Sequence, residues 1–310
     1  MRYINYNTEQ LNNIQQFAYD YAKKSCEISY YPLCIQIEPT NYCNYKCEFC
    51  YNKNLKNKGF IEIELVNKII EEVKEKTLRI GFVWRGEPLL NKNIGYFVKV
   101  AAENNLKPYI VTNGSLLSYE ISVELIKNGL NYINFSLDSI DSDYYNNIRK
   151  NGSYEDVLNN IKDFLIAKRQ FGSRYLPYTV ISFIEFSSLE KEKIMSKFSG
   201  DYINNISFTK PHNWAGSIKQ NLNIKKIVNK FDKCSEIWKR MIIGFNGNVY
   251  LCCMDMAENC YIGNIKNNKV IDIWKNNYKQ FREKIKNGNY AHPMCEKCIF
   301  SEESNKSWYI

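Results

Sequence analysis

Long apolar runs are missing from this sequence. Although 45% of its 310 residues are hydrophobic, no stretch approaches the roughly 18 consecutive apolar residues that a membrane-spanning helix needs. The first 24 residues also lack an apolar segment between a basic start and a small-residue cleavage site, so they are not typical of a secretory signal. We therefore expect a cytoplasmic protein without a membrane partner, in a compartment where thiols stay reduced.

Repeats, low-complexity linkers and arginine-rich stripes are missing as well. The formal net charge is +9, and the lysines are scattered among asparagines, as in residues 52–59 and 219–230. This distribution favours a solvated surface, so we expect no nucleic-acid partner, while an anionic small-molecule substrate is compatible with it.

Segments of strand and helix character alternate along the first two thirds of the chain. Six segments are typical of strands: 34–39, 78–84, 107–114, 132–139, 178–185 and 203–210. Helical spacing of apolar residues falls between them, in segments 61–76, 93–104, 118–128 and 154–168. Six β–α units of this kind imply an α/β fold with a parallel sheet.

The alternation loosens after residue 211, where the predicted strands become shorter and cysteines return. Residues 244–255 (GFNGNVYLCCMD) are typical of a small hairpin. We therefore predict three parts: an N-terminal helical extension (1–33), a partial (β/α)6 barrel of the TIM kind (34–211) and a small C-terminal domain (212–310).

The eleven cysteines are the most informative residues. Cys43, Cys47 and Cys50 stand within eight positions after the first predicted strand, at the edge where barrel folds place their chemistry. In a reducing compartment such thiols are more often metal ligands or catalytic groups than disulfides. A structural zinc ion takes four protein ligands, so three thiolates suit a metal site, or an iron–sulfur cluster, that keeps one position open.

The spacing C-x3-C-x2-C, with Phe49 before the last cysteine, resembles the signature of radical S-adenosylmethionine (radical SAM) enzymes. Three downstream segments are similar to that family as well: RGEP (85–88), VTNG (111–114) and FSLDS (135–139). The resemblance implies a partial (β/α)6 barrel, a [4Fe-4S] cluster held by the three cysteines, and S-adenosylmethionine bound to its open iron. One residue departs from the family, because Arg85 replaces the first of two glycines.

The resemblance also implies roles for single residues. Phe49 would lie against the adenine, while Gly86 and Glu87 would receive the methionine amino group, which needs acceptors such as a carbonyl and a carboxylate. Arg149 would clamp the methionine carboxylate. The remaining cofactor-binding candidates are Asn113, Ser136 and Asp138. Of these, Ser136 and Asp138 would face the ribose and the methionine end. Each motif alone is also common in ordinary turns and helix caps.

A second group of cysteines lies in the C-terminal part. The spacing of Cys234, Gly247 and Cys252, followed by CEKC at 295–298, resembles the SPASM or twitch extension of radical SAM enzymes. Residues 299–310 contain no cysteine, so the resemblance implies the shortened form, with one auxiliary [4Fe-4S] cluster. Its expected ligands are Cys234, Cys252, Cys295 and Cys298. Cys253 is the alternative to Cys252, and a zinc site is the alternative to the cluster.

By resemblance, the protein cleaves S-adenosylmethionine to a 5′-deoxyadenosyl radical that removes a hydrogen atom from its substrate, with a flavodoxin- or ferredoxin-type electron donor. We expect oxidation (dehydrogenation) or epimerisation of a sugar-like or other small metabolite. Modification of a ribosomal peptide is the alternative, and it is less favoured because we expect no extra N-terminal leader-binding domain. An electron carrier or a zinc-dependent nucleic-acid binder would each account for only one cysteine set.

Three further residues are candidates for catalysis. His212, one of only two histidines, follows the sixth predicted strand and could accept a proton. Cys253 and Cys260 are left over from the expected ligand sets, and an S–H group could return a hydrogen atom in an epimerisation. The alternative for all three is a structural role as buried side chains.

Overall fold

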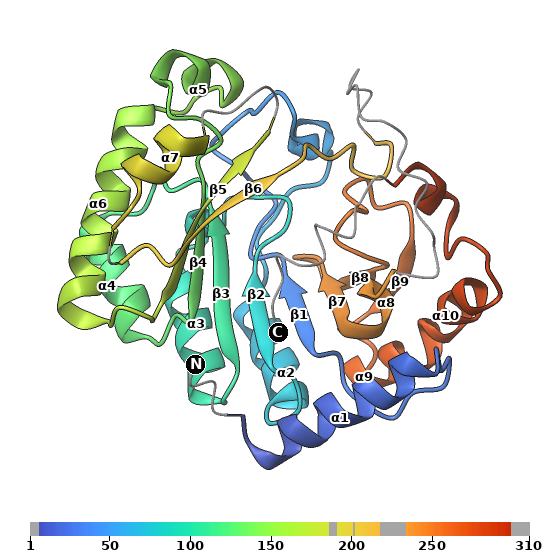
Figure 1. Ribbon diagram of the computed structural model, residues 1–310. Coiled ribbons are helices and arrows are strands. Elements are labelled where there is room, and N and C mark those ends of the chain that lie inside the picture. Colours follow the sequence, from blue (N-terminus) through green and yellow to red (C-terminus); the bar gives the residue numbers. More distant parts are fainter. Residues whose placement is uncertain (1–5, 186–190, 201, 218–233, 299–310) are drawn as a thin grey trace.

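The structure is a computed structural model that describes residues 6–185, 191–200, 202–217 and 234–298 (Figure 1). The lysine-containing stretch 219–230 and the cysteine-free residues 299–310 lie outside the described residues. Within the described ranges, no helix is both long enough and apolar enough to span a membrane.

One continuous sheet runs through the molecule in the order β6-β5-β4-β3-β2-β1-β7-β8-β9. Its strands are β1 (Cys34–Ile37), β2 (Arg79–Phe82), β3 (Lys107–Thr112), β4 (Tyr132–Ser136), β5 (Tyr178–Ile184), β6 (Asn205–Thr209), β7 (Arg240–Ile243), β8 (Asn248–Tyr250) and β9 (Tyr261–Asn264). Strands β1 to β6 are mutually parallel and coincide with the six predicted segments. The predicted α/β partial barrel is confirmed, and the sheet is not closed.

The helices alternate with the strands. They are α1 (Thr8–Ala22), α2 (Ile63–Val73), α3 (Ile94–Glu103), α4 (Tyr119–Lys127), α5 (Ser142–Ile148), α6 (Tyr154–Phe171), α7 (Lys191–Lys197), α8 (Glu236–Lys239), α9 (Val270–Asp272) and α10 (Lys279–Lys286). Shorter helical turns are η1 (Tyr51–Asn54), η2 (Pro88–Leu90), the π-helical η4 (Ile273–Asn277) and η5 (Pro293–Lys297). Helices α3, α4 and α6 cover the outer side of the sheet, and α1 crosses below the amino ends of the strands (Figure 1).

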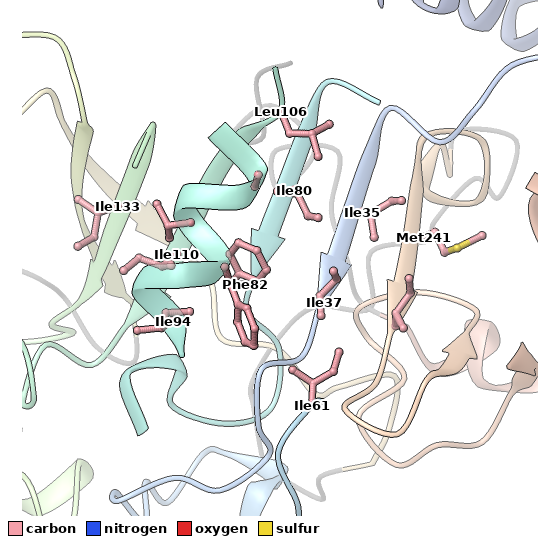
Figure 2. Close-up of a cluster of buried hydrophobic side chains, with 14 of the residues drawn as sticks. Ile35, Ile37, Ile61, Ile80, Phe82, Ile94, Leu106, Ile110, Ile133 and Met241 are labelled. Carbon is pink, nitrogen blue, oxygen red and sulfur yellow. The ribbon is translucent and has the colours of Figure 1, made fainter. Parts of the chain in front are cut away.

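The main core lies between the sheet and these helices. Ile35 and Ile37 of β1 stand in register with Ile80 and Phe82 of β2, and all four point to the helix side (Figure 2). The helical periodicity of 61–76 is borne out in α2, whose buried residues are Leu65, Val66, Ile69, Ile70 and Val73. Burial of such side chains contributes roughly 1.5–3 kcal/mol each.

The C-terminal part extends the same sheet. Strand β7 pairs in parallel with β1, and β8 returns antiparallel to β7 as the predicted hairpin. The predicted domain limits at 33/34 and 211/212 remain predictions, and the sheet crosses the second of them.

The face that points away from the helices, here called the inner face, is built in layers, because alternate residues of a strand point to opposite sides. Tyr109, Tyr132 and Tyr178 stand in register, with ring centroids 6.1 and 6.0 Å apart, and form a tyrosine layer. Nearer the carboxyl ends, a serine row consists of Ser136, Ser182 and Ser207. On the inner face, the polar serine row therefore lies between the tyrosine layer and the carboxyl edge of the sheet.

Candidate active site at the carboxyl edge of the sheet

The first cysteine loop follows β1 and is fixed to the end of α5. The amide N–H groups of Lys46 and Glu48 donate to the carbonyls of Lys150 and Ile148, at 2.9 and 3.1 Å. A tighter turn closes the C-x2-C segment, where the Cys50 N–H donates to the Cys47 carbonyl at 3.2 Å. The loop thus holds its half-buried cysteines in a defined place next to β1.

The three thiols of this loop are electrostatic neighbours. Burial raises the pKa of Cys43 to about 12, and the charges of Cys47 and Cys50 contribute to that shift. Burial likewise raises the pKa of Cys47 to about 11. Since a metal ligand must be a thiolate, loading of a cluster here would release protons.

The three thiols suit an iron–sulfur cluster. The part of the chain that the structure describes contains no group of three or more His, Cys, Asp or Glu side chains arranged around one metal ion. A [4Fe-4S] cluster presents a separate iron to each thiolate, so its ligands need not converge on one point. Three free, half-buried thiols on one loop satisfy that requirement.

Gly86 and Glu87 lie against the cysteine loop. A Cβ at Gly86 would come within 2.2 Å of the Thr40 carbonyl oxygen, so this close approach requires glycine. The N–H of Glu87 donates to the Tyr42 carbonyl at 2.9 Å. These contacts place the GEP segment directly beside Cys43.

The Glu87 carboxylate already accepts three hydrogen bonds. Its oxygens receive the Thr112 hydroxyl at 2.7 Å, the Asn113 N–H at 2.8 Å and the Leu89 N–H at 3.2 Å. Burial raises the pKa of Glu87, while the bonds from Asn113 and Thr112 lower it. A carboxylate has about four acceptor positions, so one is left for an ammonium group, and the role assigned to Glu87 stays a prediction.

Asp138 and Arg149 form a buried ion pair. The Arg149 Nε lies 3.0 Å from Asp138 Oδ2, and the Arg149 Nη2 contacts the same oxygen. The other oxygen, Oδ1, accepts the Ile184 N–H at 3.0 Å. Asp138 adopts a left-handed backbone with φ of 63°, which Asp tolerates better than most residues. Arg149 is thus oriented by Asp138.

Arg149 also faces the cysteine loop. Its guanidinium carbon lies 5.7 Å from the centre of the Phe49 ring, and its charge lowers the pKa of Cys47. Three of the sequence-predicted residues are therefore brought together with the first cysteine set: Phe49, Asp138 and Arg149.

Asn113 belongs to a polar network that sequence reasoning did not foresee. Its Nδ2 donates to Asn44 Oδ1 at 3.0 Å, and its Oδ1 accepts the Ser115 hydroxyl at 2.7 Å. Asn44 in turn donates to Ser115 at 2.8 Å. Asn44 lies beside Cys43 in the sequence, and this position was the available signal. Ser136 stands apart from the network, half-buried in the serine row.

Arg85 is a second residue whose role the sequence did not reveal. It forms a bidentate pair with Glu38, both bonds being 2.7 Å, and its Nη1 contacts Glu258. The side chains of Arg85 and Glu38 are fully buried. Glu258 belongs to the loop between β8 and β9, so the arginine that replaces the family's glycine joins the first site to the second. Trp84 adds a parallel link, because its Nε1 donates to the Cys253 carbonyl at 3.0 Å.

The second cysteine set gathers residues from three parts of the chain. The pKa of Cys252 is raised by burial and then by the charges of four other thiols, those of Cys253, Cys298, Cys295 and Cys234. The pKa of Cys253 is raised by burial and then by the charges of Glu236 and Cys298, while the charge of Arg240 lowers it. Cys252 therefore lies within electrostatic reach of the other three expected ligands, and the choice of Cys252 over Cys253 stays a prediction.

The remaining catalytic candidates lie in different surroundings. Cys260 is buried, and its N–H donates to Asp255 at 2.8 Å. His212 lies on the segment 211–217 after β6, with its ring 5.8 Å from that of Trp214. Burial lowers the pKa of His212, so the imidazole is neutral near pH 7 and has a nitrogen that accepts a proton.

Two family models match the chain. Residues 37–172 match that of the Radical SAM superfamily, and residues 234–299 match that of the SPASM iron-sulfur cluster-binding domain. GTP 3',8-cyclase of Desulforamulus reducens is 29% identical over 136 residues, which cover 42% of each chain. The chain thus spans less than half the length of this relative.

Other similarities extend along nearly the whole chain. The S-adenosyl-L-methionine-dependent 2-deoxy-scyllo-inosamine dehydrogenase of Niallia circulans is 23% identical over 85% of this chain and 91% of its own. The structure of BtrN in complex with AdoMet and 2-DOIA superposes with a TM-score of 0.59, at 20% identity, over 88% of this chain and 94% of BtrN. The structure of Streptococcus suis SuiB bound to precursor peptide SuiA superposes with a TM-score of 0.67, at 18% identity, over 88% of this chain and 71% of SuiB. These two structures share the fold.

Proposed function

Because the chain belongs to the radical SAM superfamily and carries a C-terminal SPASM iron-sulfur cluster-binding domain, we propose that it oxidises an alcohol carbon of a hydroxyl-rich small molecule, such as an aminocyclitol or a sugar. The two domains imply S-adenosylmethionine, a [4Fe-4S] cluster at the first cysteine set and auxiliary cluster binding at the second. A radical SAM enzyme also needs a reductant. The dehydrogenase activity and the substrate class are the proposal.

The inner face of the sheet is the observation that carries this proposal. Above the tyrosine layer, the strands present the serine row, whose three residues are half-buried. A compact ligand with several hydroxyl or amino groups would form hydrogen bonds with these serine hydroxyls, whereas an apolar ligand would cover them without any.

The extent of the similarities supports the same substrate class. The dehydrogenase from Niallia circulans aligns with both parts of this chain, and the GTP cyclase aligns over only two fifths of it. What that dehydrogenase oxidises, 2-deoxy-scyllo-inosamine, is a hydroxyl-rich ring of the kind that the polar inner face would accommodate. The proposal is therefore oxidation at a ring carbon.

The residues of the chain divide the work. When bound, S-adenosylmethionine and its cluster supply a hydrogen-abstracting radical, and an auxiliary cluster supplies an electron acceptor. Arg149, oriented by Asp138, would hold the methionine carboxylate. His212 would take the hydroxyl proton, so that the alcohol loses two electrons and two protons in all. Cys234, Cys252, Cys295 and Cys298 would hold one auxiliary cluster.

The test is turnover by the anaerobically reconstituted full-length chain with S-adenosylmethionine and a chemical reductant. We expect 2-deoxy-scyllo-inosamine or a related polyol to yield a product two mass units lighter, together with 5'-deoxyadenosine. In deuterated water, no deuterium should enter at carbon. A product of unchanged formula with one carbon-bound deuterium, dependent on Cys253 or Cys260, would instead establish epimerisation. Modification of peptides but not of polyols would establish a peptide maturase.

A further inference from the structure

The two C-x2-C segments of the chain form the same turn. In the first, the Cys50 N–H donates to the Cys47 carbonyl at 3.2 Å, and in the second, the Cys298 N–H donates to the Cys295 carbonyl at 3.1 Å. In each turn, the peptide unit before the last cysteine is therefore held through its N–H group. The carbonyl of the same unit, from Phe49 or Lys297, points elsewhere and needs its own partner.

Two consecutive side chains supply those partners. The indole Nε1 of Trp214 donates to the Phe49 carbonyl at 3.1 Å, and the Nδ2 of Asn213 donates to the Lys297 carbonyl at 2.7 Å. One dipeptide thus contacts the equivalent position of both cysteine turns, although these turns are separated by more than two hundred residues in the sequence.

The backbone around this dipeptide is built to present both side chains. Trp214 and Ala215 adopt left-handed conformations with φ of 48° and 52°, and Gly216 follows with 83°. Two backbone hydrogen bonds hold this shape. The Gly216 N–H donates to the Asn213 carbonyl at 2.9 Å, and the Ser217 N–H donates to the Trp214 carbonyl at 3.1 Å. Left-handed non-glycine residues cost free energy and persist only where the surroundings hold them.

Gly216 adds a second contact with the auxiliary turn. A Cβ at this position would come within 2.7 Å of the Lys297 side chain. Asn213 and Gly216 thus both lie against Lys297 of the second turn, while Trp214 reaches the first.

We propose that Asn213 and Trp214 act as a clasp, a pair of positioning residues that fixes the two cluster-binding turns relative to each other. This proposal rests on the part of the proposed function that places a cluster at each turn. It does not depend on the identity of the substrate. A donor on a peptide carbonyl polarises that peptide and strengthens the N–H dipole beside the cysteine sulfur. Hydrogen bonding around cysteine ligands is one of the factors that set the potential of an iron–sulfur cluster.

The clasp predicts a crossed effect. Trp214→Phe keeps the ring but removes the N–H donor, and Asn213→Ala removes the amide donor. Each variant should loosen its own turn and, through the shared backbone of 213–216, the other turn as well. Loss of a donor also leaves more negative charge near the sulfur, so the reduction potential of the adjacent cluster should become more negative.

The test uses the full-length chain reconstituted with iron and sulfide, and it measures hydrogen exchange of the peptides that contain 47–50 and 295–298. In Trp214→Phe, amides of the first turn should exchange roughly threefold to tenfold faster, as expected for one lost hydrogen bond, with a smaller acceleration in the second. Asn213→Ala should show the reverse order. A redox titration followed by electron paramagnetic resonance should show the negative shift in each case.

Matched controls separate the clasp from a general loss of stability. Trp238→Phe removes an indole N–H that donates to the Ser25 carbonyl at 2.9 Å, and Asn104→Ala removes an amide that donates to Val100 at 2.8 Å. Neither should change exchange in the cysteine turns or the potentials. Asn213→Gln keeps an amide donor, so its effects on exchange and potential should be smaller than those of Asn213→Ala.

Acceleration confined to the turn next to each substitution, or no change in either turn, would overturn the clasp. If Trp214→Phe does not load iron, the test rests on Asn213→Ala. Faster exchange in residues 47–50 of that variant supports the clasp, and unchanged exchange there refutes it. Iron content and S-adenosylmethionine cleavage, measured on the same samples, report the proposed function separately.

Discussion

The two cysteine sites are built in different ways. The first takes its three thiols from one loop after β1, within eight positions of the sequence, and this loop is fixed to neighbouring segments by backbone hydrogen bonds. The second draws its four expected ligands from before α8, after β8, and from η5 and the residue that follows it. The first site is therefore largely a local structure placed on a barrel strand, and the second exists only once the C-terminal part has folded. Perturbations of tertiary contacts should affect the second site more.

The largest expected effect separates the two sites directly. Replacing Cys43, Cys47 and Cys50 together with Ala should abolish S-adenosylmethionine cleavage and leave about half of roughly eight irons. Replacing Cys295 and Cys298 with Ala should also remove about half of the iron but should preserve cleavage while abolishing the oxidised product. Iron analysis and chromatography of 5'-deoxyadenosine check both. Cleavage in the triple variant would refute the assignment of the first site.

The assignment of Cys252 sharpens the comparison within the second site. Cys252→Ala should remove the auxiliary cluster, because this thiol lies among the three other expected ligands. Cys253→Ala, one position away, should retain it. Visible absorption and iron content of the two variants measure this difference, and a reversed result would exchange their roles.

Arg85 tests how strongly the two sites depend on each other. Arg85→Met should destabilise the protein by about 3–5 kcal/mol, because it leaves the fully buried Glu38 carboxylate without its partner. Glu258→Gln is the control, since the Glu258 side chain is 38% exposed and its loss should cost about 1 kcal/mol or less. Urea unfolding of the reconstituted chain compares them. Equal costs would show that the link between the sites, rather than the buried charge, dominates.

Arg149 provides a smaller effect that should stay within the first site. Arg149→Ala should weaken S-adenosylmethionine binding by about 1.5–3 kcal/mol, the contribution of one charged hydrogen bond, and should leave iron content unchanged. Arg149→Lys keeps the positive charge but loses the bidentate fork, so its affinity for S-adenosylmethionine should lie between those of the unchanged protein and Arg149→Ala. Equilibrium binding of S-adenosylmethionine measures the series. Unaltered affinity in Arg149→Ala would refute the role assigned to Arg149 in holding the methionine carboxylate.

The smallest expected effect is a pH dependence that reports His212, between the two sites. Because burial lowers its pKa in the folded protein, the unfolded chain binds more protons near pH 6. Its contribution to stability is therefore present above the ordinary histidine pKa of about 6.5 and is lost as pH falls through the folded value. Product formation should fall over the same acidic range. His212→Gln should remove this pH dependence in both unfolding and turnover assays.

Much of the barrel was determined by local sequence pattern. The six strands and four of the helices between them follow from periods of about 2 and 3.6 residues, which depend on which side of each element is buried, whereas α5 and α7 were not predicted. The C-x3-C-x2-C loop was equally readable, because its ligands lie close together in the sequence. The distant serine row and tyrosine layer were not identified, since register between strands depends on how separate segments pack.

Tertiary structure alone decided how the parts are joined. Nothing in the sequence near β7 indicates that it pairs with β1, two hundred residues earlier. The arginine at position 85 was visible as a departure from the family, but its partners, Glu38 and Glu258, come from distant segments. The same holds for the bonds of Asn213 and Trp214 to the two cysteine turns. Sequence pattern reports which faces are buried, whereas a pairwise contact between distant residues is fixed only when the chain has folded around its core.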